Sequence, residues 1–211
     1  MKRVRESEIG NRNSDEHEVP AATSHAELRE KASRFVAFVI PIADASDAAR
    51  EIARLAKEHY DASHVCFAWK HGTGDSARRR SSDAGEPAGT AGAPLAAAID
   101  ASLLTDVLVA VVRHFGGTKL GKGNLARAYR AAATEALSAA PRRTVWETRA
   151  IEVLAPWERV AAARRLIAPP DIRLVEESAG ELCRLRLEVR ASRVEALRER
   201  LREARLDWRD L

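Results

Sequence analysis

The strongest constraint on the fold is one unbroken apolar segment that is followed directly by glycines. Residues Val107 to Val112 are all Val, Leu or Ala, so this strand-length run contains no polar side chain. A run of this kind is typical of a strand buried on both faces, and we expect it at the centre of a sheet. The next segment, Arg113 to Gly123, contains four glycines and leads into an apolar-periodic helix over 125–139.

The remaining patterns predict a two-domain α+β protein. Before the central strand, we expect a strand from Arg34, a helix capped by Asp44 or Ser46, a strand over 64–70, a long loop over 71–92 and a short helix over 94–99. After Pro141, the order strand, helix, strand, strand, helix, short strand is that of a ferredoxin-like domain. The predicted divisions are a flexible tail over 1–26, a first domain over 27–140 and a second domain over 141–211.

The composition excludes several classes of protein. The chain has 211 residues, of which 45% are hydrophobic and 31% charged, which is typical of a globular protein. No run approaches the roughly 20 apolar residues of a membrane span, and the first residues contain no apolar signal segment. Two cysteines, Cys66 and Cys183, are too few for a disulfide framework or a thiolate metal site. We therefore expect a cytoplasmic protein that has no metal, no cofactor and no membrane partner.

A basic segment follows the central strand. The formal net charge is only +4, yet residues 113–130 contain five basic side chains and no acidic one. Glycines free backbone N–H groups, and together with a helix N-terminus they form an anion site, to which lysines add charge. The predicted anion- or nucleic-acid-binding residues are Arg113, Gly116, Gly117, Lys119, Lys122, Arg127 and Arg130. The alternative is an ordinary strand-to-helix connection with solvated lysines.

A second glycine-rich segment, residues 82–94, is expected to face the first across a groove. Its predicted contributors are Asp83, Gly85, Glu86, Gly89, Thr90 and Gly92, with His64 and His114 as possible groove walls. If the two loops converge, Glu86 and His114 form an acid–base pair. His114 and Phe115 are candidates for contact with nucleobases. We interpret Cys66 as a packed thiol, because no local base would activate it.

The segment from Gly116 to Lys122 matches the first seven positions of the P-loop. The eighth position requires Ser or Thr to hold magnesium, and it is Gly123, so nucleotide hydrolysis is not expected. No catalytic residue is assigned. An alternative is a small-molecule enzyme with Glu86 as general base and Lys119 or Lys122 as anion clamp. A further alternative is a module that binds only protein.

The two glycine-rich segments resemble the YigZ/IMPACT family of small cytoplasmic proteins. The family patterns are D-x-GEP-x-GTAG-x-P and, after a strand, RYFGG-x-KLG-x-GGL-x-RAY. This chain has Asp83 to Pro94 as DAGEPAGTAGAP and Arg113 to Tyr129 as RHFGGTKLGKGNLARAY. The resemblance extends over about 31–139, and the departures are His114 for Tyr and Asn124 for Gly.

The resemblance implies a first domain with the fold of the second domain of a small-subunit ribosomal protein. It implies a ferredoxin-like second domain similar to C-terminal domains of elongation factor G. Family members have no established catalytic activity. The eukaryotic relatives are linked to control of translation through competition for an activator of a starvation-sensing kinase. We therefore expect a non-catalytic binding protein that associates with RNA or the ribosome, or with a translation-related protein.

Overall fold

The structure, a computed structural model, describes residues 15–211. Within this part, the chain forms two compact units, one over 17–145 and one over 146–211 that also includes Asp15 and Glu16. The division after Val145 lies a few residues beyond the predicted boundary near Pro141. None of the helices in the described residues has the length and apolar character needed to cross a membrane.

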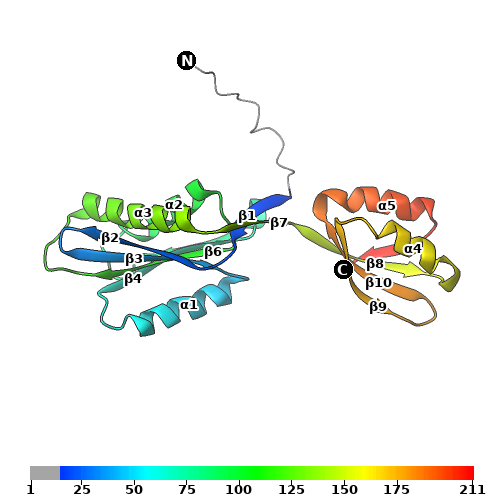
Figure 1. The fold of residues 1–211 in the computed structure, drawn as a ribbon, viewed down its shortest axis with the longest axis horizontal. Helices are drawn as coiled ribbons and strands as arrows, with labels where there is room; N and C mark the ends of the chain where they lie inside the picture. Colours follow the sequence, from blue (N-terminus) through cyan, green and yellow to red (C-terminus); the bar gives the residue numbers. More distant parts are fainter. Residues whose placement is uncertain (1–14) are drawn as a thin grey trace, which may run out of the picture. The chain divides into compact units, whose positions relative to one another are not determined.

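The first unit contains a five-stranded sheet in which all neighbours are antiparallel (Figure 1). In spatial order its strands are β2 (Ser24–Glu30), β3 (Ser33–Pro41), β6 (Val107–His114), β4 (His64–His71) and β5 (Arg78–Ser82). The central position of β6 confirms the prediction from its unbroken apolar run. Helix α1 (Ala45–Glu58) covers one face of the sheet, and α2 (Gly92–Ser102) and α3 (Lys122–Ala139) cover the other.

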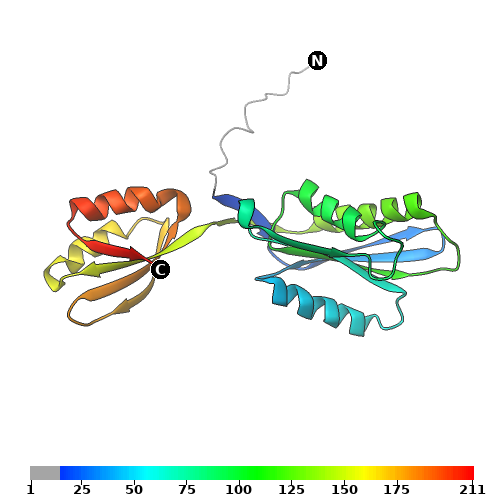
Figure 2. The same ribbon diagram turned by 180° about the vertical axis from the view of Figure 1, so that it is seen from behind.

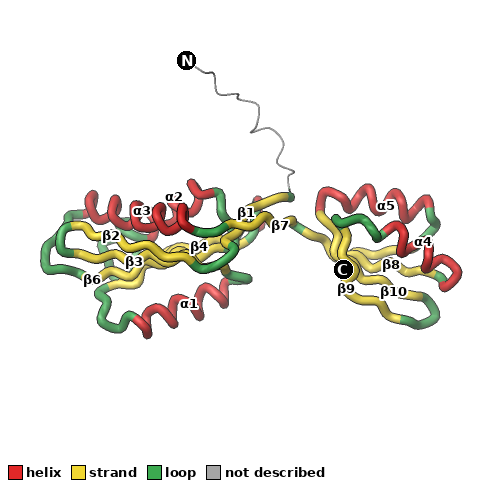
Figure 3. Tube along the Cα trace, in the orientation of Figure 1, coloured by secondary structure: helices red, strands yellow, loops and turns green. Residues whose placement is uncertain are grey.

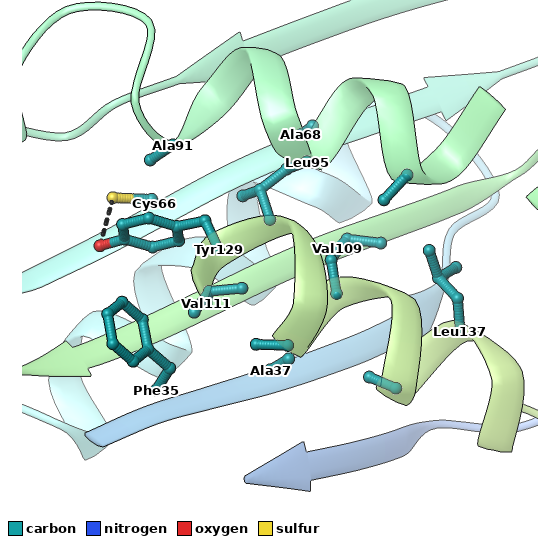
Figure 4. Packing of buried hydrophobic residues seen from close by; sticks show 14 of the residues in the cluster. Phe35, Ala37, Cys66, Ala68, Ala91, Leu95, Val109, Val111, Tyr129 and Leu137 are labelled. Carbon is teal, nitrogen blue, oxygen red and sulfur yellow. Dashed lines mark hydrogen bonds between the residues drawn. The ribbon is translucent and has the colours of Figure 1, made fainter. Parts of the chain in front are cut away.

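The centre of the sheet is buried on both faces because the three inner strands, β3, β6 and β4, alternate between two cores. On the side of α2 and α3, the Phe35 and Tyr129 rings pack edge to face with centroids 5.1 Å apart (Figure 4). On the side of α1, Trp69 and Leu108 pack against Leu55. Each large side chain buried in this way stabilises the fold by about 1.5–3 kcal/mol. Asp44 caps α1 as predicted, since its carboxylate accepts hydrogen bonds from the N–H groups at the start of the helix.

The predicted tail over 1–26 is wrong for its described part. Residues 16–20 form β1 (Glu16–Pro20), which pairs with β7 (Arg142–Trp146), and β2 begins at Ser24 (Figure 2). β2 has a half-buried alternating pattern with only Ala26 and Leu28 packed on the core. These two apolar residues stand among polar and charged ones, so the alternation of apolar and polar residues that predicts a strand is too weak to recognise. Residues 1–14 of the predicted tail lie outside the described residues.

The predicted loop over 71–92 is also shorter than expected. A 3-10 turn, η1 (Gly74–Ser76), and the edge strand β5 occupy much of it, which leaves 83–91 as the loop proper. β5 consists of three arginines and two serines, and hydrophobic periodicity cannot identify such a strand. Its exposed arginines suit an edge strand, where charge prevents pairing with other chains.

The second unit has a four-stranded antiparallel sheet with two helices packed on one face (Figure 3). Its elements follow the predicted order of types: β8 (Thr148–Ala155), η2 (Trp157–Arg159), α4 (Val160–Leu166), β9 (Ile172–Ser178), β10 (Cys183–Arg190), η3 (Ala191–Arg193), α5 (Val194–Glu203) and β11 (Asp207–Asp210). The strands lie in the order β11-β8-β10-β9. Asp15 is buried in this unit and accepts hydrogen bonds from Arg190 and from the Ser192 amide.

Candidate ligand-binding pocket

A buried ion pair joins the two glycine-rich segments. The Glu86 side chain is 3% exposed and the Arg113 side chain 6%. Arg113 Nη1 donates a hydrogen bond of 2.6 Å to Glu86 Oε1, and the Tyr129 hydroxyl donates one of 2.8 Å to the same oxygen. Buried charges persist only when they are paired and hydrogen-bonded in this way. The pair therefore fixes the loop over 83–91 onto β6 and α3.

Strand geometry explains why these groups meet. Along β6, Val109, Val111 and Arg113 point to the α2–α3 face, because side chains alternate along a strand. The Arg113 guanidinium lies 5.4 Å from the centre of the Phe35 ring, and its Nη2 donates to Ser33 Oγ at 3.1 Å. The second-to-last residue of β6 therefore places a cation on the α2–α3 side of the sheet.

Above this pair lies a cavity of about 440 Å³, which we call the Glu86 pocket. It is lined by Ser63, His64, Glu86, Pro87, Arg113, Phe115, Lys119, Leu120, Gly121, Lys122 and Leu125. Its size and mixed polar and apolar lining are typical of small-ligand sites. Phe115 is 44% exposed, and Arg113 lies 5.3 Å from the centre of its ring.

The basic side of the Glu86 pocket is open. Lys119 and Lys122 are exposed, and within residues 15–211 neither has a carboxylate at ion-pair distance. α3 begins at Lys122, and no side chain caps it. Its N-cap, Gly121, has a φ of +78°, a conformation that favours glycine. An uncapped helix N-terminus with two unpaired lysines can hold an anion.

The floor of the pocket carries two further polar atoms. Glu86 Oε2 accepts no hydrogen bond from the described residues and lies 3.9 Å from His64 Nε2. His64 Nδ1 lies 2.9 Å from the carbonyl oxygen of Ala84. The pocket thus combines a basic rim with a floor at which one carboxylate oxygen is available to a ligand.

Every lining residue of the Glu86 pocket falls within one match to a known family. The sequence profile of the Impact N-terminal domain matches residues 31–137. The chain belongs to the IMPACT family. It is 37% identical over 120 residues to the IMPACT family member YvyE of Bacillus subtilis, which covers 57% of this chain and 54% of that relative. It is 37% identical over 120 residues to IMPACT family member YigZ of Escherichia coli, covering 56% and 59%.

The chain therefore aligns with little more than half the length of the curated relatives it matches. Among solved structures, it resembles a crystal structure described as that of a hypothetical protein. The two are 26% identical, the similarity covers 93% of this chain and 98% of the other, and the TM-score is 0.73. The two-unit architecture is thus shared by another protein of the same length range.

Of the predicted anion-binding residues, Lys119 and Lys122 lie at the Glu86 pocket, and Arg127 and Arg130 are exposed on α3 outside its lining. Arg113 also lines the pocket, where it is paired with Glu86. The roles of these five basic residues in ligand binding stay predictions.

Two of the predicted glycines have roles other than pocket lining. A Cβ at Gly116 would lie 1.8 Å from the carbonyl oxygen of Ala32, so this position is occupied by glycine because the β2–β3 turn packs against it. Gly117 is exposed and does not line the cavity. Neither glycine is therefore explained by anion binding alone.

Most of the second glycine-rich loop satisfies its own hydrogen bonds. The Asp83 carboxylate accepts hydrogen bonds of 2.8–2.9 Å from the amides of Gly89, Ala91 and Gly92. Burial alone would raise the pKa of Asp83, but these three N–H groups hold it below its usual value. The Thr90 hydroxyl donates to the carbonyl of Pro87. Asp83, Gly89, Thr90 and Gly92 do not line the Glu86 pocket, and their place in a groove stays a prediction.

From this loop, Glu86 and Pro87 reach the pocket. Gly85 lies against the ring of His64, since a Cβ at this position would be 3.3 Å from His64 Nδ1. The loop therefore contributes its carboxylate to the pocket and uses most of its other polar groups to hold its own shape.

The predicted acid–base pair of Glu86 and His114 does not form. His114 follows Arg113 on β6 and so points to the opposite face of the sheet, where its ring lies 6.2 Å from that of His59. Its Nδ1 is 3.6 Å from Asp61. His64, the other predicted wall, does line the Glu86 pocket.

Cys66 lies below the pocket as a buried thiol. Its sulfur is 3.0 Å from the carbonyl of Asp83 and 3.3 Å from the Tyr129 hydroxyl (Figure 4). Burial raises the pKa of the Cys66 thiol to about 12 and also raises the pKa of Tyr129. A thiol that stays protonated is a poor nucleophile, which agrees with our interpretation of Cys66 as a packing residue.

The sequence did not indicate Ser33, Ser63 or the role of Tyr129. These residues reach the site through the pairing of β3 and β4 with β6 and through the packing of α3, which no local motif encodes. In the part of the chain that the structure describes, no group of three His, Cys, Asp or Glu side chains is arranged to hold a metal ion.

Proposed function

We propose that this protein binds single-stranded segments of RNA at the Glu86 pocket. One observation carries the proposal: two exposed lysines without acidic partners, Lys119 and Lys122, border a cavity that also has the exposed ring of Phe115. Phosphates bind to unpaired lysines, and an exposed aromatic ring offers a stacking surface for a base. Stacking of this kind contributes about 1–3 kcal/mol per base.

The neighbouring surface supports the same ligand. Arg127 and Arg130 continue the basic run along the exposed side of α3, and no carboxylate among residues 15–211 pairs with either. A second candidate, catalysis with Glu86 as general base, is less well supported. Two donors, from Arg113 and Tyr129, already occupy Glu86 Oε1, and the predicted acid–base partner His114 lies on the opposite face of the sheet.

We propose that RNA binding serves the regulation of translation in the cytoplasm, which is the role that the family resemblance implies. Ribosomal RNA is then the expected partner. Co-sedimentation with ribosomes on sucrose gradients tests this step. The wild-type protein should move with ribosomal particles, and a Lys119→Gln, Lys122→Gln variant should remain at the top of the gradient.

Binding itself is tested with fluorescently labelled single-stranded RNA and anisotropy. The Lys119→Gln, Lys122→Gln variant should bind more weakly than wild type, because two phosphate contacts are lost. The matched control is Arg50→Gln, Lys57→Gln on α1, which makes the same charge change on the opposite face of the sheet. Equal losses in both variants, or no binding by the wild type, would refute the proposal.

We also propose that the second unit has the ferredoxin-like fold that the resemblance implies. Its strand order β11-β8-β10-β9, with antiparallel neighbours throughout, supports this assignment. An experimental structure compared with ferredoxin-like domains would test it.

A further inference from the structure

The floor of the Glu86 pocket presents a hydrogen-bond acceptor without a donor. The Glu86 side chain is 3% exposed, and its Oε1 accepts from Arg113 and Tyr129. Its Oε2 accepts no hydrogen bond from the described residues, although the residue lines the cavity. Because Glu86 lines the cavity, this oxygen is reached from the pocket, and a carboxylate oxygen can only accept, so a ligand that supplies an N–H group can bind it.

A second acceptor lies beside it. The carbonyl oxygen of Ala84 can only accept, so the 2.9 Å contact assigns the proton of neutral His64 to Nδ1. In this neutral tautomer His64 Nε2 carries a lone pair and faces Glu86 Oε2 at 3.9 Å, whereas a protonated His64 would form an ion pair with Glu86 at the same distance. Two acceptors at this distance repel each other weakly and call for a group that donates to both. With His64 neutral, the floor of the pocket presents two acceptors, which favours a ligand edge that carries two donors.

Among the four RNA bases, guanine carries two adjacent donors on its Watson–Crick edge, N1–H and the N2 amino group. Uracil presents one N–H between two carbonyl oxygens, and those oxygens would face the acceptors of Glu86 and His64. Adenine and cytosine each place an amino group next to a ring nitrogen that accepts. The floor of the pocket thus matches guanine better than any other base.

The rest of the pocket fits the remaining parts of a nucleotide. Phe115 offers its exposed ring for stacking on a base, and Lys119 and Lys122 lie at the rim, where a phosphate would enter. We propose that the Glu86 pocket selects an unpaired guanine in single-stranded RNA through Glu86 Oε2 and His64 Nε2. This inference rests on the proposed RNA binding.

The test compares three labelled oligomers of equal length and charge: an oligouridine with one central guanosine, the same oligomer with inosine, and oligouridine alone. The guanosine oligomer should bind to the wild-type protein about tenfold more tightly than oligouridine. Inosine lacks the N2 amino group, so its oligomer should bind several-fold more weakly than the guanosine oligomer. Neither comparison depends on a variant that must fold.

The decisive variant is Glu86→Gln. Its amide oxygen can still accept from Arg113 and Tyr129, which turns the amide nitrogen, a donor, toward the pocket. The preference for guanosine over oligouridine should then disappear. The control is Asp61→Asn, an exposed carboxylate that contacts His114 on the other face of the sheet and should keep the preference.

The outcomes separate the two proposals. Binding of all three oligomers with equal affinity to the wild type overturns guanine selection and leaves RNA binding intact. Absence of binding to every oligomer overturns both. A folded Glu86→Gln protein that keeps the guanosine preference also overturns the selection by Glu86.

Discussion

Replacing Arg113 with methionine should destabilise the first unit selectively. Methionine fills much of the same volume but has no charge, so the Glu86 carboxylate, 3% exposed, would be left buried without its counterion. Removing one partner of a buried ion pair costs about 3–5 kcal/mol of folding free energy. Ser33 and Glu86 Oε1 would also lose a donor.

Hydrogen exchange measured by mass spectrometry can localise the loss. A change of about 3–5 kcal/mol corresponds to an increase of roughly 10²- to 5 × 10³-fold in the exchange of amides that open by unfolding of the unit. Peptides that cover β6 should show this acceleration. Peptides that cover β10, which lies in the other compact unit, should not change and serve as an internal control.

A double variant makes the test stricter. Arg113→Met combined with Glu86→Leu removes both charges, so exchange of β6 should return most of the way to the wild-type rate. The argument is refuted if Arg113→Met changes the exchange of β6 by less than about tenfold. It is also refuted if the double variant exchanges faster than the single one.

Three other predictions concern stability. Gly116→Ala should lower the urea midpoint of the first unit, because the new Cβ would overlap the carbonyl of Ala32; an unchanged midpoint contradicts this. Asp83→Ala should cost about 1–2 kcal/mol by removing the acceptor of three amides, one in the loop and two at the start of α2. Because the folded pKa of Asp83 is lowered, its contribution is present at neutral pH and is lost on acidification, so wild type and variant should converge at low pH. The pKa of the Cys66 thiol is raised to about 12 in the folded protein, so on raising the pH the thiol ionises first in the unfolded chain. The free energy of unfolding should therefore fall between about pH 9 and 12, by at most about 1.4 kcal/mol per pH unit. Cys66→Ala should reduce this dependence on pH.

The sequence predicted the elements whose hydrophobic pattern is strong. The unbroken run of β6 predicted its central position, and Asp44 predicted the start of α1. β2 and β5 were missed because edge strands need few apolar side chains: β5 has none, and β2 has two that contact the core. For such strands, pairing with a neighbour determines the structure, and pairing is not visible in a local pattern.

The candidate site was predicted in part for the same physical reason. Glycine and lysine spacing indicated the loop at Lys119 and Lys122, since loop chemistry is local. The buried pair of Glu86 and Arg113 depends on contacts 27 residues apart in sequence. Strand alternation could have separated Arg113 from His114, because adjacent residues of a strand point to opposite faces.

The salt dependence of RNA affinity tests the central claim most directly. For single strands, each lysine–phosphate contact contributes about 0.7 to the slope of log affinity against log salt concentration. The Lys119→Gln, Lys122→Gln variant should therefore have a slope about 1.4 shallower than the wild-type protein, and Arg50→Gln, Lys57→Gln should match the wild type. Identical slopes for wild type and the Lys119, Lys122 variant would contradict RNA binding at the Glu86 pocket.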